Sequence, residues 1–153
     1  MIKTSIALYI LLVLCAAGCS KTAEVVPVIP VVGATKFPAP TWKADDTGKY
    51  PATMTAVVAL PAAMVANITP GDKLAAFING ECRGVGVVDK VNSQDLFFVL
   101  IQGLPDETGK ITFKYYNEKT AYMFEASSVI NFLIDGVYGS AQNPKVLELK
   151  HVN

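Results

Sequence analysis

From residue 42 to the C-terminus, apolar runs rich in β-branched and aromatic residues alternate with turn-forming residues. No segment shows the 3.6-residue apolar period of an amphipathic helix. The pattern therefore predicts an all-β domain over residues 41–153 with about eight strands. The predicted strands cover residues 53–60, 73–78, 81–88, 96–102, 110–117, 121–124, 129–134 and 146–150.

The pair Asn79-Gly80 lies between two of these apolar runs. Both residues tolerate positive φ, which a two-residue type I′ hairpin requires. A regular hairpin around this turn sets Ala76 opposite Arg83. On that register Arg83 shares a face with aliphatic side chains of both strands, namely Leu74, Ala76, Ile78, Val85 and Val87.

Two further runs predict where strands lie in the sheet. Residues 96–101 are apolar at every position, as is typical of a central strand covered on both faces. Over residues 111–116, strongly apolar residues alternate with more polar ones. This alternation predicts that one face of the strand is buried and that the other face, which includes Tyr116, is exposed to solvent.

Strands joined by hairpin-length connections, without crossover helices, favour two packed antiparallel sheets. We therefore expect an antiparallel β-sandwich of immunoglobulin-like type. An open β-barrel is the alternative, because strand spacing alone does not separate the two architectures.

The first 18 residues have the three parts of a bacterial signal peptide. Lys3 is their only charge, residues 6–14 are almost wholly apolar, and small residues precede Cys19. The apolar run is well short of the ~20 residues that a membrane-spanning helix needs.

The stretch Leu14-Cys15-Ala16-Ala17-Gly18-Cys19 resembles the bacterial lipobox, with Ala16 where a leucine usually stands. The resemblance implies that Cys19 is the first mature residue and carries lipid, with acyl chains such as palmitate. Ser20, in place of an aspartate, implies the outer membrane of a Gram-negative bacterium. Simple secretion with cleavage nearby is the alternative.

Residues 19–40 are rich in proline and valine and show no sustained period. We expect a disordered tether that spans on the order of 65 Å when extended. Signal cleavage removes only Lys3 from the 13 basic residues, which leaves 12 basic against 13 acidic side chains. Because no basic cluster occurs either, nucleic acid is not an expected partner.

The chain offers little catalytic chemistry. His151 is the only histidine and lies two residues from the end, so a nucleophile–histidine pair would rest on a fraying terminus. Cys82 stands alone after cleavage and lipidation, which excludes an internal disulfide and favours a buried thiol. We predict no enzyme, no metal site and no cofactor. Calcium held by Asp45, Asp46 or Asp72 stays open, although the spacing of a dedicated calcium loop is missing.

Two groups of residues are candidates for binding. Arg83 needs a carboxylate, and Glu81 and Asp135 are the candidate partners of a structural ion pair, the alternative being a ligand-binding arginine. Asp106-Glu107 is expected in a solvated turn. Four aromatic side chains are candidate platforms for sugar rings. They are Trp42, Tyr50, Tyr116 and Tyr122.

Residues 42–150 resemble a β-sandwich module that recurs in bacterial secreted and surface proteins. The resemblance is carried by residues 50–58, 71–77, 81–85, 111–116 and 132–136. It implies a fold but transfers no catalytic or binding residue. We therefore expect a non-enzymatic binding or adhesion module of the cell envelope. The alternatives are a carbohydrate-binding accessory protein of a polysaccharide-capture system, and a structural component of a surface fibre or envelope complex.

Overall fold

The structure is a computed structural model that describes residues 33–153. The predicted signal peptide, Cys19 and residues 20–32 of the predicted tether lie outside the described residues. The described chain is almost entirely β, which confirms the all-β prediction. Its elements are β1 (Ala52–Ala59), α1 (Ala62–Val65), β2 (Lys73–Ile78), β3 (Glu81–Val91), β4 (Gln94–Gly103), β5 (Lys110–Asn117), β6 (Tyr122–Ala126), β7 (Ile130–Asn131), β8 (Val137–Tyr138), β9 (Lys145–Val146) and β10 (Leu149–His151).

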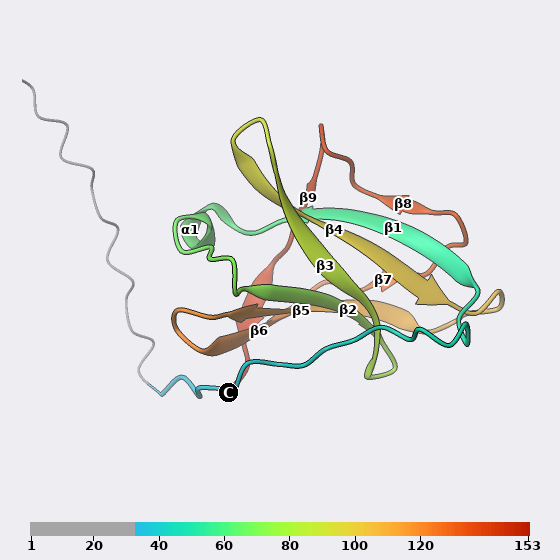
Figure 1. The fold of residues 1–153 in the computed structure, drawn as a ribbon, viewed down its shortest axis with the longest axis horizontal. Helices are drawn as coiled ribbons and strands as arrows, with labels where there is room; N and C mark the ends of the chain where they lie inside the picture. The colour runs from blue at the N-terminus through green and yellow to red at the C-terminus, as the bar shows by residue number, and fades with distance from the viewer. Residues whose placement is uncertain (1–32) are drawn as a thin grey trace, which may run out of the picture.

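All strands belong to one curled, ten-stranded sheet (Figure 1). Its order is β10-β6-β5-β2-β3-β4-β1-β8, with β7 beside β5 and β9 beside β1. We call β10, β6, β5 and β2 the first half-sheet, and β4, β1 and β8 the second. The long strand β3 joins them, because it pairs with β2 up to Val85 and with β4 from Gly86 onward.

The two half-sheets face each other across one core. Phe97 of β4 meets Tyr115 of β5 edge to face, with ring centroids 6.2 Å apart. Phe113 of β5 stacks on Tyr138 of β8 at 6.5 Å. The immunoglobulin-like sandwich stays a prediction, since a single continuous sheet also has the character of an open barrel.

The C-terminal segment crosses between the half-sheets on the side away from β3. Strand β9 runs parallel to β1, and the Leu147 N–H donates to Ala59 C=O at 3.0 Å. One residue later Glu148 C=O accepts from Ser127 N–H at 2.8 Å, and β10 then pairs with β6. The residues predicted as one strand, 146–150, therefore belong to two short strands, of which β9 pairs with β1 and β10 pairs with β6.

The hairpin at Asn79-Gly80 is confirmed, with φ angles of 52° and 80°. Its predicted register is wrong beyond the second pair, because a bulge sets Ala76 opposite Gly84 instead of Arg83. A bulge adds one residue to one strand and reverses which side chains face inward after it. Val85 and Val87 consequently face outward, with 38% and 68% of their surface exposed.

Residues 36–50 form a strap along the outward side of the first half-sheet (Figure 1). Phe37 N–H donates to Ala121 C=O at 2.8 Å, and the Lys73 ammonium donates to Pro40 C=O at 2.7 Å. The prediction that Tyr116 is exposed to solvent is wrong, because only 4% of its surface is accessible. The strap therefore covers part of the outward side of this half-sheet, where Trp42 packs on Phe77 and leaves it 7% exposed.

Candidate functional site

The four aromatic candidates do not form a shared platform. Tyr50 and Tyr116 are each 4% exposed and offer no ring face for stacking on a sugar. Trp42 is half-buried and packs edge-on against Phe77, with centroids 5.4 Å apart. Tyr122 lies near the C-terminus, where its ring meets that of His151 at 4.7 Å.

The calcium candidates are each engaged by protein groups. Asp45 accepts the Thr47 hydroxyl at 2.8 Å, and Asp46 pairs with Lys43. Asp72 accepts hydrogen bonds from the Tyr115 hydroxyl and from Glu118 N–H, so it ties β2 to β5. Within residues 33–153, no three His, Cys, Asp or Glu side chains gather in a group that could hold a metal ion.

Arg83 is the centre of a buried polar cluster at one end of the sheet. Its guanidinium lies 3.2 Å from Glu107 and 3.6 Å from Glu81, and its side chain is 5% exposed. The Tyr50 ring covers it, with 3.3 Å between the guanidinium carbon and the ring centroid. Asp135, the other predicted partner, takes part in no ion pair of the described chain.

Glu107 corrects the expectation of a solvated acidic turn. Its side chain is 6% exposed, and its second oxygen accepts Gly109 N–H at 3.1 Å. Nothing in the local sequence marks Glu107 as buried, because its partner lies 24 residues away along the chain.

Glu81 forms the exposed side of the same cluster. It accepts hydrogen bonds from the Tyr50 hydroxyl and from the Lys49 ammonium, the latter at 2.9 Å. These hydrogen bonds, that from Tyr50 first, hold the pKa of Glu81 below its usual value of 4.5. The buried ion pairs of Arg83 with Glu107 and Glu81 favour the structural role over ligand binding, although its Nε has no hydrogen-bond partner among the described residues.

Cys82 is half-buried, and burial raises the pKa of its thiol. A thiol with a raised pKa is largely protonated near neutral pH and is a poor nucleophile. The thiol contacts the Gly84 carbonyl, whereas the ring of His151, the only histidine in the sequence, packs against Tyr122 and Phe124.

The outward side of the second half-sheet is largely apolar and is exposed in part, because Val57 is 5% exposed and packs in a small cluster with Ala59 and Leu96. In one row across the strands, Thr55 lies opposite Leu100 and beside Val137, and in the next Phe98 lies between Val57 and Val87. We call these six residues the outer apolar face. The prediction that residues 96–101 are covered on both sides is therefore wrong for Leu100, which is 56% exposed.

No charged side chain stands in either row of the outer apolar face. Val137 and Val87 are 70% and 68% exposed, and a turn beside Val137 also exposes Leu133 and Ile134. Asp135 holds this turn with φ 55° and an N–H bond to Thr53 C=O at 2.8 Å. Contiguous exposed apolar surface of this kind marks interaction sites.

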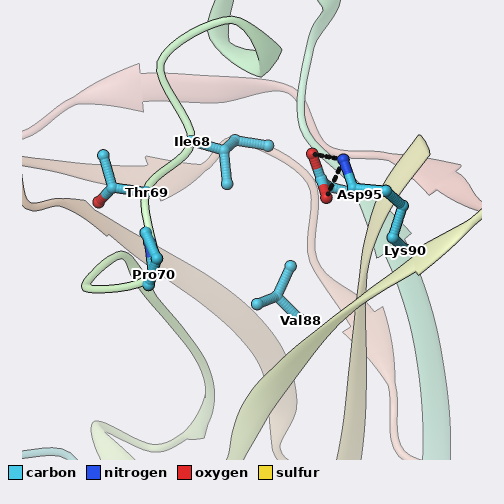
Figure 2. A pocket seen from close by; sticks show the side chains of 6 residues that line it. All are labelled: Ile68, Thr69, Pro70, Val88, Lys90 and Asp95. Carbon is cyan, nitrogen blue, oxygen red and sulfur yellow. Dashed lines mark hydrogen bonds and ion pairs between the residues drawn. The ribbon is translucent and has the colours of Figure 1, made fainter. Parts of the chain in front are cut away.

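A concave feature lies beside the C-terminal half of β3 (Figure 2). It is a cavity of about 260 Å³ between the segment after α1 and the β3–β4 hairpin. Its mouth carries the ion pair of Lys90 with Asp95 at 3.1 Å. We call this cavity the slot. Its lining residues are Ile68, Thr69, Pro70, Val88, Lys90 and Asp95.

No protein-family model, curated protein or solved structure matches this chain. Residues 33–153 contain no helix of the length and apolarity that a membrane crossing requires. Residues 33–153 form an all-β domain with an exposed apolar face and a small slot.

Proposed function

We propose that this protein is a lipid-anchored component of the bacterial cell envelope whose β domain binds another envelope protein. The observation that supports binding is the outer apolar face, which crosses four strands, has no charge in its two rows and exposes Val87, Leu100 and Val137. Such a face favours a partner with a flat apolar surface. We propose no catalytic activity.

The anchor rests on the sequence before the domain. Residues 1–18 have the pattern of a signal peptide, and Cys19 ends a stretch that resembles the lipobox. Acyl chains at Cys19 would hold the protein at a membrane, since each buried methylene contributes about 0.8 kcal/mol. We further propose an outer-membrane location, from Ser20, and an immunoglobulin-like sandwich as the fold family.

The anchor is tested by expressing the full chain in a Gram-negative host with radioactive palmitate. We expect label on the wild-type protein and its recovery in the detergent phase after phase separation. Cys19→Ser should lose the label and move to the aqueous phase. A labelled Cys19→Ser protein, or an unlabelled wild type, would contradict the anchor.

The binding face is tested in living cells with a photo-crosslinking residue at position 100. We expect one dominant cross-linked protein, and Val87→Lys should reduce its yield at least several-fold. The same probe at Lys119, in the exposed β5–β6 turn, is the control and should give no such product. Equal yields at positions 100 and 119 would refute the proposed face.

Sugar binding has weaker support, because Tyr50 and Tyr116 are buried. Retention of the protein on a polysaccharide gel, lost in Trp42→Ala, would restore that alternative. Polymers held together through the outer apolar face would favour the structural role.

A further inference from the structure

The slot opens where strands β2 and β3 separate. Their pairing ends with Ala75 opposite Val85, and the chain before β2 turns away from β3. In Figure 2, Ile68 and Val88 project into the gap from opposite sides. The slot volume of about 260 Å³ suffices for one branched aliphatic side chain.

The polar groups beside the slot already have partners. Lys90 N–H donates to the Asp89 carboxylate at 2.7 Å, and the Lys90 ammonium pairs with Asp95 at 3.1 Å. The Thr69 hydroxyl donates to the Asp72 carboxylate at 2.9 Å. An occupant of the slot is therefore held by apolar packing instead of by backbone hydrogen bonds.

The chain itself carries a segment with matching chemistry just before the described residues. Residues 25–32 of the tether are eight consecutive apolar residues, Val-Val-Pro-Val-Ile-Pro-Val-Val. Chain that stays in solvent is usually poor in aliphatic residues, so this run favours a segment that packs on other apolar groups. Pro27 and Pro30 lack a backbone N–H, which suits an occupant that forms no ladder.

The spacing of the two prolines places three aliphatic side chains on one side of this segment. Pro27 and Pro30 favour polyproline II, which has three residues per turn. Residues three apart therefore share a face, and one face carries Val26, Ile29 and Val32. Ile29 is at the centre of that face and has the largest side chain of the run.

The described chain begins close to the slot. Phe37 N–H donates to the C=O of Ala121, in the β5–β6 turn, at 2.8 Å. Three residues back in the same turn, the Glu118 carboxylate lies 3.1 Å from the hydroxyl of Thr69, which lines the slot. Those three residues span at most about 11 Å. Figure 1 shows the start of the described chain, the β5–β6 turn and α1 at the same end of the domain.

The chain between the strap and Ile29 is long enough to reach the slot. Lys36 is fixed by its bridge to Tyr122, and Ile29 lies seven residues before it. In polyproline II seven residues span about 22 Å. Because the segment is attached to the domain, its effective concentration at the slot is on the order of millimolar, which favours it over a segment of a separate protein.

We propose that the tether docks in the slot in polyproline II conformation, with the Ile29 side chain between Ile68 and Val88. Docking shortens the free tether from 17 residues (19–35) to ten (19–28), or from roughly 50 Å to roughly 30 Å when extended. The slot thus sets how far the domain stands from a lipid at Cys19, and only this consequence rests on the proposed anchor. The contact goes beyond the proposed function, because it uses Val88 on the inward side of β3 whereas the outer apolar face uses Val87.

The test uses the mature chain from residue 19 with Cys19→Ser, so that no lipid is attached, and isoleucine and valine labelled at their methyl groups for NMR. We expect nuclear Overhauser contacts between the methyl groups of Ile29 and Val88. Ile29→Ser should shift the methyl resonances of Ile68 and Val88 and leave those of Val87 unchanged. Val25→Ser, four residues away and on another face of the segment, is the matched control and should shift none of them.

A second measurement follows the reactivity of a thiol in the tether. In the same lipid-free chain, Ile29→Cys should react with iodoacetamide at least about threefold more slowly than Val25→Cys, which corresponds to about two-thirds docked. Adding Val88→Phe, which fills the slot, should remove this difference. Mass spectrometry of the labelled peptides separates these thiols from Cys82. The NMR measurement changes only the tether, so the proposal stays testable if Val88→Phe does not fold.

Three results would overturn the proposal. They are the absence of contacts between Ile29 and Val88, equal resonance shifts in Ile29→Ser and Val25→Ser, and a thiol difference that Val88→Phe leaves intact. Contacts that arise only between differently labelled copies would overturn it as well, because they assign the slot to the tether of a second copy. All of these tests use the lipid-free chain, so their failure is separate from a failure of Cys19 lipidation in the palmitate experiment.

Discussion

Arg83 is a charged residue whose side chain is buried instead of lying at the surface. Its guanidinium and the Glu107 carboxylate are both almost fully buried at a separation of 3.2 Å. The desolvation cost of two such charges is close to their mutual attraction, so the pair adds little net stability. Losing one partner is costly because the other charge stays buried. The Tyr50 ring adds cation–π contact on one side of the guanidinium.

Arg83→Met should lower the free energy of unfolding by about 3 kcal/mol, because Glu107 is left buried without a counter-charge. Urea denaturation followed by circular dichroism measures the change. The double variant with Glu107→Gln removes both charges and keeps an acceptor for Gly109, so it should recover at least about 1 kcal/mol. Strict additivity of the two single changes would show that the charges do not interact.

Glu81 predicts a dependence of stability on acid pH. Its folded pKa lies below its usual value of 4.5, mainly through the Tyr50 hydrogen bond. Its stabilising contribution is therefore complete above that value and is lost as the pH falls through the folded pKa. Glu81→Gln should be less stable than wild type at pH 7 and equally stable at pH 2. Urea midpoints at both pH values check this, and a difference that grows on acidification would contradict it.

Tyr115 predicts the opposite dependence at alkaline pH. Burial, and next the hydrogen bond to Asp72, raise the pKa of its hydroxyl. A raised folded pKa means that the stability contribution is complete below the ordinary tyrosine value near ~10 and is lost as the pH rises above it. Tyr115→Phe should weaken this alkaline loss, measured by urea midpoints between pH 8 and pH 11. Unchanged alkaline loss in the variant would assign it to other groups.

At the scale of elements, the two hairpins of β3 use different turn residues for the same geometry. The turn at Asn79-Gly80 has glycine at its second position with φ 80°, whereas Ser93 holds φ 66° in the β3–β4 turn. The left-handed backbone conformation costs a residue with a Cβ roughly 1 kcal/mol, whereas glycine adopts it without this cost. The second turn therefore carries strain that the first avoids.

Ser93→Gly should raise the free energy of unfolding by about 0.5 kcal/mol, because relief of the φ strain exceeds the added entropy of the unfolded chain. Gly80→Ala is the reciprocal change and should lower it by about 1 kcal/mol. Both are measured by thermal and urea unfolding. Destabilisation by Ser93→Gly would mean that the serine side chain contributes more than its backbone costs.

The bulge shows why alternation alone misplaced one strand. The pattern of β3 fits a regular ladder that places Val85 and Val87 inward, yet the observed pairs place Gly84 opposite Ala76. Glycine suits the inward position at Gly86, where a Cβ would lie 3.2 Å from the Leu74 side chain. Close packing across the sheet therefore decided the register that the local pattern left open.

The whole molecule is held together where chain segments cross between the half-sheets. Strand β3 does so on one side and the C-terminal segment on the other, with Leu147 at the crossing and 1% exposed. Because the half-sheets share one core, neither buries its apolar side without the other. The molecule should therefore unfold as a unit.

Leu147→Ala should lower the free energy of unfolding by about 3 kcal/mol through a cavity in the shared core. Val146→Ala, whose side chain is 60% exposed, is the neighbouring control and should change it by less than about 0.5 kcal/mol. Emission from Trp42, which packs on the first half-sheet, and far-ultraviolet circular dichroism should give coincident transitions in both variants. Separate transitions would show that the half-sheets unfold independently.

The sequence by itself determined the β character, the approximate position of the longer strands and the turn at Asn79-Gly80. These follow from local preferences, because side-chain alternation and tolerance of positive φ act within a few residues. The signal-peptide and lipobox patterns are also local, and they support the proposed anchor.

Only the tertiary structure decided which groups meet across the chain. The pairing of Arg83 with Glu107, the burial of Tyr116, the exposure of Leu100 and the opening of the slot all depend on segments distant in sequence. Each follows from how the sheet curls and which segment covers each side, a competition among long-range contacts that local pattern does not encode.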